Sequence, residues 1–173
     1  AEVAKGLGAP LDVLVVRKVG VPGHEELAAG AVASGGAMVV NDDVLLAAGL
    51  DRLELEQRVA ERRHAVDEME HRLRGDRPPL DLAGRTAVLV DDGLATGATM
   101  RVAASAVRRG GPKSIIVAVP VGARQAVHAL RRSVDQVICP STPEPFVAVG
   151  IAYQDFHQLS DAETRDLIAA HRP

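Results

Sequence analysis

Along the second half of the chain, short apolar runs alternate with stretches of helical spacing. The runs are rich in β-branched residues and predict buried strands over 86–90, 114–119 and 135–139. The stretches between them predict helices over 98–109 and 123–131. Strands joined by helices through short turns run parallel, with right-handed crossovers. The pattern therefore predicts an α/β fold around a doubly wound, mainly parallel sheet.

The remaining elements are spread over the first half and the end of the chain. An apolar run predicts a buried strand over 11–16, and a shorter run predicts another over 38–41. Helical spacing predicts helices over 1–8, 53–73 and 160–171, and the last of these opens with a capping box. The helix over 53–73 carries an apolar stripe, which we interpret as core, with a subunit contact as the alternative. The stripe consists of Leu55, Val59, Val66, Met69 and Leu73.

Glycine is concentrated between the first predicted strand and the next element. Residues 17–36 contain five glycines and one proline, a composition that argues against a regular element. Structureless segments of this length in compact domains are usually functional lids or linkers. We therefore predict a flexible lid loop over 17–37, within a single domain that spans residues 1–173.

Composition and charge narrow the class of protein. Hydrophobic residues make up 47% of the chain and charged residues 25%, an ordinary globular mixture. The formal net charge of −3 argues against a nucleic-acid or anionic-membrane binder. The one cysteine, Cys139, excludes an intrachain disulfide and a cysteine-based zinc site. Because no apolar run approaches about 18 residues and residues 1–10 lack a signal-peptide layout, we expect a cytoplasmic protein.

The segment that carries chemistry is Val88–Met100, with the sequence VLVDDGLATGATM. It lies where a predicted buried strand ends and a helix begins, the usual anion-binding position of an α/β fold. Residues 96–99 can turn backbone N–H groups and two threonine hydroxyls toward one phosphate. Asp91 and Asp92 precede them and suit sugar hydroxyls or a hydrated Mg²⁺ ion. A sugar phosphate would satisfy both halves of the segment, and the Walker and dinucleotide-binding patterns are absent.

Two hydrophobic residues, two acids and the Thr-Gly-x-Thr closing loop resemble the phosphoribosyl pyrophosphate (PRPP) motif of type I phosphoribosyltransferases. Residues 11–22, 26–31 and 146–161 also resemble a bacterial group within that family. The resemblance implies a sheet core with a small hood, which we expect at 38–52 and 141–160. It also implies transfer of ribose 5-phosphate from PRPP to a nitrogen acceptor such as a nucleobase, with release of pyrophosphate and with Mg²⁺ as cofactor.

The resemblance assigns a role to each matching residue. Asp91 and Asp92 would hold the ribose hydroxyls and, through water, the metal, and Lys18 would act with them in catalysis. The PRPP-binding set would be Arg17, Asp91, Asp92, Gly93, Ala95, Thr96, Gly97, Ala98 and Thr99. Arg17 and Lys18 would face the pyrophosphate.

Two departures from the family pattern affect the prediction. Family members that use 6-oxopurines carry an acid where this chain has Ala95, so we expect an acceptor other than hypoxanthine or guanine. The family also places an Arg-Gly-Gly pyrophosphate loop after a first strand, upstream of the helix that matches residues 1–8. The chain shows neither there, so we expect weak pyrophosphate binding and slow turnover.

All three aromatic residues fall within eleven positions: Phe146, Tyr153 and Phe156. They could form a stacking wall for a planar base or a small satellite core under the hood. Two other functions stay open, a PRPP- or nucleotide-sensing protein without turnover and a hydrolase that uses water as acceptor. We further expect a homodimer that binds small molecules, without a nucleic-acid or membrane partner.

Overall fold

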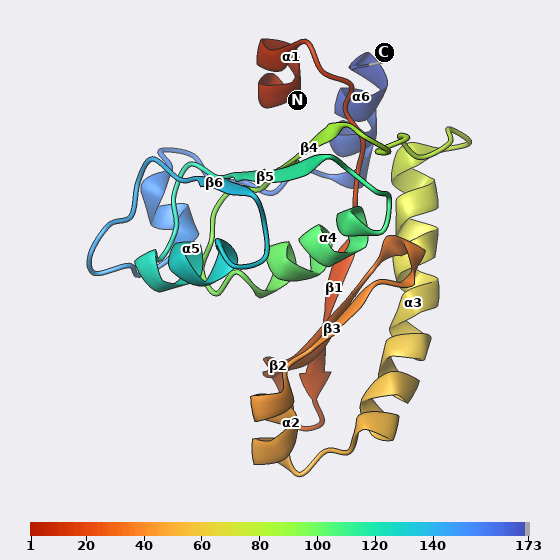
Figure 1. Ribbon diagram of the computed structural model, residues 1–173, viewed down its shortest axis with the longest axis vertical. Coiled ribbons are helices and arrows are strands. Elements are labelled where there is room, and N and C mark those ends of the chain that lie inside the picture. Colours follow the sequence, from red (N-terminus) through yellow and green to blue (C-terminus); the bar gives the residue numbers. More distant parts are fainter. Residues whose placement is uncertain (172–173) are drawn as a thin grey trace.

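The computed structural model describes residues 1–171, apart from the side chains of residues 25–27. The strands form two separate three-stranded sheets, one parallel and one antiparallel. Figure 1 shows the parallel sheet across the upper half of the molecule and the antiparallel sheet below it, beside the long helix α3. The candidate site belongs to the parallel sheet, and the antiparallel sheet packs against the helix that follows the site.

The parallel sheet has the strand order β4–β5–β6. Its strands are β4 (Thr86–Val90), β5 (Ser114–Ala118) and β6 (Gln136–Ile138). The crossovers are helices α4 (Ala98–Arg108) and α5 (Arg124–Leu130), which lie on the same side of the sheet in Figure 1. The predicted α/β fold with a parallel sheet is therefore confirmed, and the predicted ends of these five elements are correct to within one residue.

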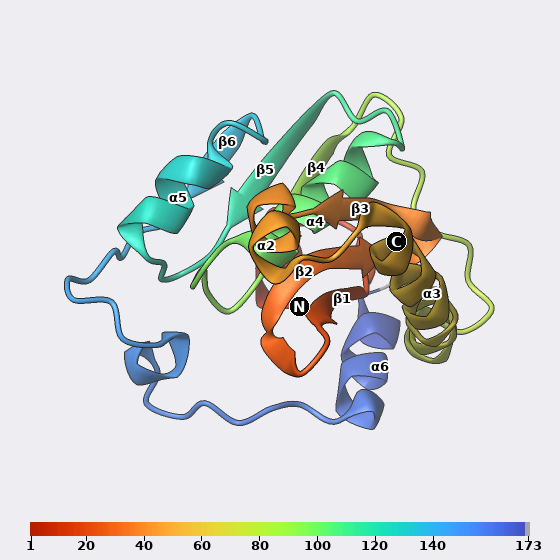
Figure 2. The same cartoon turned by 90° about the horizontal axis from the view of Figure 1, so that it is seen from below.

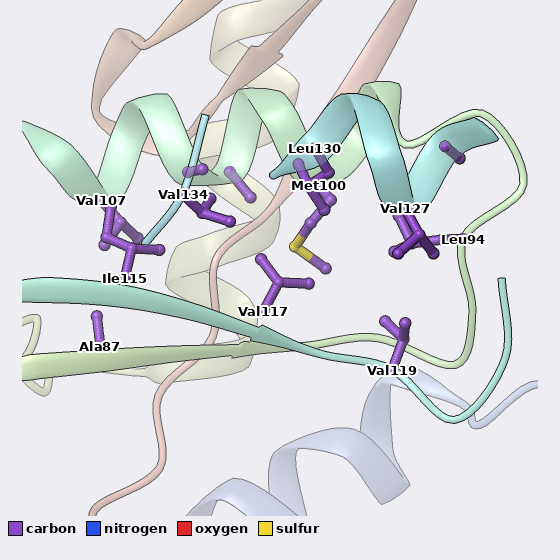
Figure 3. Packing of buried hydrophobic residues seen from close by; sticks show 13 residues of the cluster. Ala87, Leu94, Met100, Val107, Ile115, Val117, Val119, Val127, Leu130 and Val134 are labelled. Atoms are coloured by element: carbon purple, nitrogen blue, oxygen red, sulfur yellow. The ribbon is translucent and has the colours of Figure 1, made fainter. Parts of the chain in front are cut away.

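The first core lies between this sheet and its two crossover helices (Figure 3). Ile115 and Val117 alternate with half-buried residues along β5 and are completely buried. They pack with Met100 of α4 and Leu130 of α5, so burial of these side chains fixes α4 against the sheet. The opposite face of the sheet is more open, because Val90 is 52% exposed.

The second core joins the antiparallel sheet to the long helix. Its elements are β1 (Val16–Val21), β2 (His24–Ala33), β3 (Met38–Val40), α2 (Asp42–Ala48), α3 (Arg52–Arg74) and α6 (Asp161–Ala170), and the first helix, α1 (Glu2–Leu7), contributes no residue to it. The predicted stripe of α3 supplies this core, since Leu55 and Val66 are fully buried and Leu73 nearly so. A capping box between Asp51 and Glu54 begins α3. The helices predicted over 1–8, 53–73 and 160–171 are thus confirmed.

The prediction of a flexible lid loop over 17–37 is wrong, because the structure has β1, β2 and a short 3₁₀ helix, η1 (Ser34–Gly36), in that segment. Two of the glycines are needed where the antiparallel sheet turns and packs. Gly23, with φ of 75°, lies in the turn between β1 and β2. A Cβ atom at Gly30 would lie 2.8 Å from the carbonyl oxygen of Val39 on the neighbouring strand. Glycine therefore permits close strand packing here.

The strand predicted over 11–16 is also wrong, since only Val16 belongs to a strand. Side chains satisfy polar groups of this segment where a neighbouring strand would otherwise do so. Arg74 donates to the carbonyl oxygen of Val13 at 2.8 Å and pairs with the carboxylate of Asp12, also at 2.8 Å. The N–H of Val15 donates to the hydroxyl of buried Ser34 at 3.3 Å. An apolar run alone does not reveal this kind of pairing.

Within residues 1–171, no helix combines the length and the apolar character that crossing a membrane requires.

The α3 packing gives a direct test of the second core. Leu55→Ala should lower the free energy of unfolding by about 2–5 kcal/mol, because it leaves a cavity at a fully buried position. Leu53→Ala, on the same helix at a position that is 63% exposed, should change it by less than about 0.5 kcal/mol. Urea denaturation measures both, and equal losses would contradict the assigned core face of α3.

Candidate active site

The loop between β4 and α4 is held at its centre by Leu94. The N–H of Leu94 donates to the carbonyl oxygen of Val121 at 3.0 Å, and its own carbonyl accepts the N–H of Ala123 at 2.7 Å. The Leu94 side chain is buried in the first core. These contacts tie the loop to the segment that leads from β5 into α5, so the residues before and after Leu94 keep fixed positions.

Gly97 turns the chain from this loop into α4. Its φ of 73° lies in the left-handed region, which favours glycine, and a Cβ atom added there would lie 3.7 Å from the Cβ of Ala126. Gly97 has no side chain to cap the helix. The hydroxyl of Thr96 accepts the N–H of Ala98 at 3.4 Å. The other first-turn amides of α4 form a helix N-terminus, a position whose partial positive charge favours anions.

The two acids stand directly before the Leu94 contact. Asp91 is half-buried, and its Oδ1 accepts the backbone N–H of exposed Asp92 at 3.0 Å. Burial raises the pKa of the Asp91 carboxyl above its ordinary value, the bond from Asp92 N–H lowers it in part, and the negative charge of Asp92 raises it further. The site therefore holds a carboxylate whose charge the fold disfavours in the absence of a ligand.

A segment far along the chain anchors the acid loop from the other side. The hydroxyl of Tyr153 donates to the carbonyl oxygen of Asp92 at 2.6 Å. Gly93 faces Val149 in the short 3₁₀ helix η2 (Val149–Ala152), and a Cβ at Gly93 would lie 2.6 Å from a Val149 methyl group. Only glycine allows this approach, which brings part of the predicted hood segment 141–160 against the acids.

The aromatic residues are partly brought together. The rings of Tyr153 and Phe156 lie 5.2 Å apart at 45°, beside the acid loop, whereas Phe146 is half-buried outside this ring pair. Burial raises the pKa of the Tyr153 hydroxyl, and the charges of Asp92 and Asp91 raise it further. Tyr153 thus keeps its proton to donate to the loop. A stacking role for the rings stays a prediction.

A cleft of about 510 Å³ opens beside the start of α4 and is bounded by β1, β2, β3 and α2. Figure 2 shows the antiparallel sheet next to α4. It contains Lys18 together with Thr96 and Ala98 of the predicted phosphate loop. Asp42 and Arg101 also line it, and neither was expected from the sequence. The sequence did contain a signal for the former, an Asp-Asp pair just after a predicted strand.

Arg17 lies outside this cleft. Its Nη2 lies 2.9 Å from the sulfur of Met69 on α3. Neighbouring residues of a strand point to opposite faces, so Arg17 and Lys18 do not both face the cleft. The structure therefore groups Lys18, but not Arg17, with the predicted phosphate loop, and the pyrophosphate role of Arg17 stays a prediction.

The donors for a metal ion are limited. Within the described part of the chain, no group of three or more acids, histidines or cysteines could enclose a metal ion. Asp91 and Asp92 offer hard carboxylate oxygens at one place, which suits Mg²⁺, an ion that usually binds one or two carboxylates and completes its shell with water and substrate phosphates. The residues present fit that mode of binding.

A parallel strand that leads through two acids and a glycine turn into a helix defines an α/β protein with a helix N-terminus at the position where such folds commonly bind anions. The family model of the phosphoribosyl transferase domain matches residues 1–155, and the chain belongs to this family. Two proteins of Mycobacterium tuberculosis, strains CDC 1551 and H37Rv, are each 45% identical over 177 residues and are named "Putative phosphoribosyl transferase".

The alignment covers 99% of this chain but 39% of each mycobacterial protein, so the chain spans less than half the length of these relatives. The crystal structure of TT1426 from Thermus thermophilus is similar over 99% of this chain and 81% of its own, with a TM-score of 0.83 and 41% identity. The fold class expected from the sequence and the family resemblance are both confirmed.

Because the pKa of Asp91 is raised, removing its charge by substitution should stabilise the protein in a pH-dependent way. At pH 7 and without ligand, Asp91→Asn should raise the free energy of unfolding, because folding disfavours the ionised carboxyl. When the pKa of a carboxyl is higher in the folded than in the unfolded state, the carboxyl lowers the free energy of unfolding at every pH above its unfolded-state pKa. This loss disappears as the pH falls and the carboxyl takes up a proton. Denaturation at several pH values should show the gain shrinking toward acid pH. If Asp91→Asn raised the free energy of unfolding equally at acid and neutral pH, the effect would not come from the charge of Asp91. The control is Asp76→Asn, in an exposed turn.

The contact between Gly93 and Val149 makes a second prediction. Gly93→Ala should destabilise the protein by about 1–3 kcal/mol, because its methyl group would overlap a Val149 methyl group. Val149→Ala should remove most of that loss in the double variant. Gly6→Ala in α1, where nothing lies within 4 Å, should have little effect or stabilise slightly. If the two substitutions lowered the free energy of unfolding additively in the double variant, Gly93 and Val149 would not be in contact.

Proposed function

We propose that this domain transfers ribose 5-phosphate from PRPP to a nitrogen nucleophile and releases pyrophosphate. The proposal rests mainly on the placement of two acids in the loop that leads through Gly97 into the N-terminus of α4. Membership of the phosphoribosyl transferase domain family supports it. Because the chain spans 39% of its mycobacterial relatives, the proposal concerns this domain and not a whole longer protein.

The 5-phosphate would bind at residues 95–99. Gly97 gives the phosphate close access to the backbone, and the partial positive charge of the α4 N-terminus favours an anion there. Thr96 and Thr99 would add hydroxyl donors. The Leu94 hydrogen bonds keep this loop in place before substrate arrives, so the loop would lose little conformational entropy on binding.

The acids would act on the ribose. In the proposed reaction, the bond between C1 of ribose and the pyrophosphate oxygen breaks, and its electron pair leaves with the pyrophosphate. The acceptor nitrogen then forms the new bond to C1 with its lone pair, and the proton that it carried passes to the released pyrophosphate or to water. Positive charge develops on the sugar between these events, and Asp91 and Asp92 would stabilise it. The raised pKa of Asp91 means that this carboxylate is poorly solvated, which strengthens its interaction with a nearby positive charge.

The cleft supplies the group that would face the leaving pyrophosphate. Lys18 lines the cleft together with Thr96, so its ammonium could approach a ligand held on the phosphate loop. Mg²⁺, bound through Asp91 and Asp92 and their waters, would offset the charge that develops on the pyrophosphate. Interactions that strengthen as this charge develops would raise kcat.

The acceptor would lie near the η2 segment. Half-buried Tyr153 and exposed Phe156 form a ring pair next to the acids, a suitable surface for a planar base. Ala95 is exposed and offers no acid to a purine, which favours an acceptor other than a 6-oxopurine. We therefore expect pyrophosphate release with adenine or uracil to exceed that with hypoxanthine or guanine.

The phosphate loop can be tested by binding alone. Thr99→Ala should weaken ribose 5-phosphate binding about tenfold, because a hydrogen bond to a charged group contributes about 1.5–3 kcal/mol. Thr164→Ala on α6 should leave the affinity unchanged. Calorimetric titration measures both variants. If Thr99→Ala binds as tightly as the parent protein, the 5-phosphate does not lie on this loop.

The acids can be tested by turnover. Asp91→Asn and Asp92→Asn should each lower kcat for PRPP-dependent pyrophosphate release by about 10²–10³-fold, a usual effect of removing one electrostatic group from a reacting centre. Both variants should remain folded in thermal denaturation. If PRPP binds but no nitrogen acceptor increases pyrophosphate release above that with water, the domain is a sensor or a hydrolase and the transferase proposal is wrong.

A further inference from the structure

A second cavity of about 520 Å³ lies along α4, next to the cleft. It is lined by Val39, Arg101, Ala104, Ser105, Arg108, Arg109 and Ser133, a set called here the arginine groove. Arg101 and Val39 line both cavities, so the groove continues from the cleft along the helix. None of its other residues belongs to the proposed transferase site.

The groove is basic because of the spacing along α4. Arg101, Ser105 and Arg108 are separated by four and three residues, which places them on one face of the helix. Seven residues of α-helix rise by about 10 Å, so the guanidinium groups of Arg101 and Arg108 can be reached by two separate phosphate groups of one molecule. The hydroxyl of Ser105 lies between them along the same face.

The charge of these arginines is only partly offset. Arg108 forms an ion pair with Asp135 at 3.2 Å and donates to the carbonyl oxygen of Ser133 at 3.2 Å, contacts that orient its guanidinium. In the part of the chain that the structure describes, Arg101 and Arg109 form no ion pair. Asp135 is the acid that pairs with an arginine of the groove, while Asp42 and Asp43 line the adjoining cleft beside Arg101 without forming a described ion pair with it.

The helix dipole explains two of the three arginines but not the third. Arg108 and Arg109 lie at the C-terminus of α4, where the negative end of the dipole stabilises cations without any ligand. Arg101 is the fourth residue of the helix, near the positive end, where a cation is disfavoured. An anion bound beside Arg101 would remove this penalty, either in the cleft or in the groove, because Arg101 lines both.

We propose that the arginine groove binds a small molecule with two or more phosphate groups, at a site separate from the phosphate loop. The guanidinium groups and the hydroxyls of Ser105 and Ser133 would donate to phosphate oxygens. Val39 and Ala104 would contact an apolar part of the ligand. Among the described residues, no aromatic side chain lines the groove to stack on bases, and its basic face is one short helix, which favours a small polyphosphate over nucleic acid.

The test uses inorganic tripolyphosphate as the probe, titrated calorimetrically into the protein with saturating ribose 5-phosphate present. The double variant Arg101→Gln/Arg109→Gln should weaken tripolyphosphate binding at least tenfold. Because Arg109 does not line the cleft, the single variant Arg109→Gln should also weaken binding measurably. Lys18→Gln should leave the affinity within about twofold, because Lys18 lines only the cleft. The matched control is Arg72→Gln/Arg165→Gln, two exposed arginines on α3 and α6 that line neither cavity and remove the same charge.

The outcomes distinguish binding in the groove from binding in the cleft and from general charge attraction. Loss of binding in the groove variants alone supports the proposal. If Lys18→Gln lost tripolyphosphate binding and the groove variants kept it, the probe would bind in the cleft and the proposal would be wrong. Equal loss in the control pair would show unspecific attraction, and the absence of saturable binding would equally overturn the proposal. Tighter arginine-dependent binding of a single-stranded RNA oligonucleotide than of tripolyphosphate or ATP would assign the groove to nucleic acid instead. Because these comparisons do not depend on PRPP turnover, they stand even if the transferase proposal fails.

Discussion

The pair of backbone hydrogen bonds at Leu94 is the constraint on which the site depends. Asp91 and Asp92 precede this residue and the phosphate loop follows it, so both halves of the site are held from one point. The bonds connect the loop to the segment between β5 and α5, and the buried Leu94 side chain anchors it in the first core. A loop fixed in this way keeps its shape without a ligand, which reduces the conformational entropy lost on binding.

The electrostatic preferences of the two halves of the loop oppose each other. A helix N-terminus that favours anions lies five residues after two carboxylates, one of which is half-buried with a raised pKa. Such a site costs stability when empty. A ribose phosphate would relieve both ends at once, since its phosphate suits the helix and its hydroxyls suit the acids. The hydrogen bond from Tyr153 keeps the acids in place without adding a positive charge that would compete for them.

The sequence predicted best where one physical signal determines structure. Apolar runs separated by helical spacing located β4 and α4 within one residue, and the motif between them led to the acids and to Gly97. The prediction failed at residues 17–37 because glycine content was interpreted as flexibility. In the structure, Gly30 instead permits close strand packing. It also failed over 11–16, where Arg74, 61 residues beyond Val13 in the sequence, satisfies the backbone.

The tertiary partners of the site were also beyond the sequence pattern. The Gly93 contact with Val149 and the bond from Tyr153 join segments that no local periodicity connects. Arg101 was assigned only to a helix, and its position in two cavities follows from how the antiparallel sheet packs against α4. Long-range contacts of this kind require the fold to be known.

The central claim is that the loop between β4 and α4 holds the phosphate of a ribose 5-phosphate group while the two acids hold its hydroxyls. A crystal structure of the protein with ribose 5-phosphate bound tests this most directly. The account predicts the phosphate at the backbone N–H groups of residues 96–99, with the ribose hydroxyls beside Asp91 and Asp92. A phosphate bound in the arginine groove or at Lys18, with the loop empty, would contradict it.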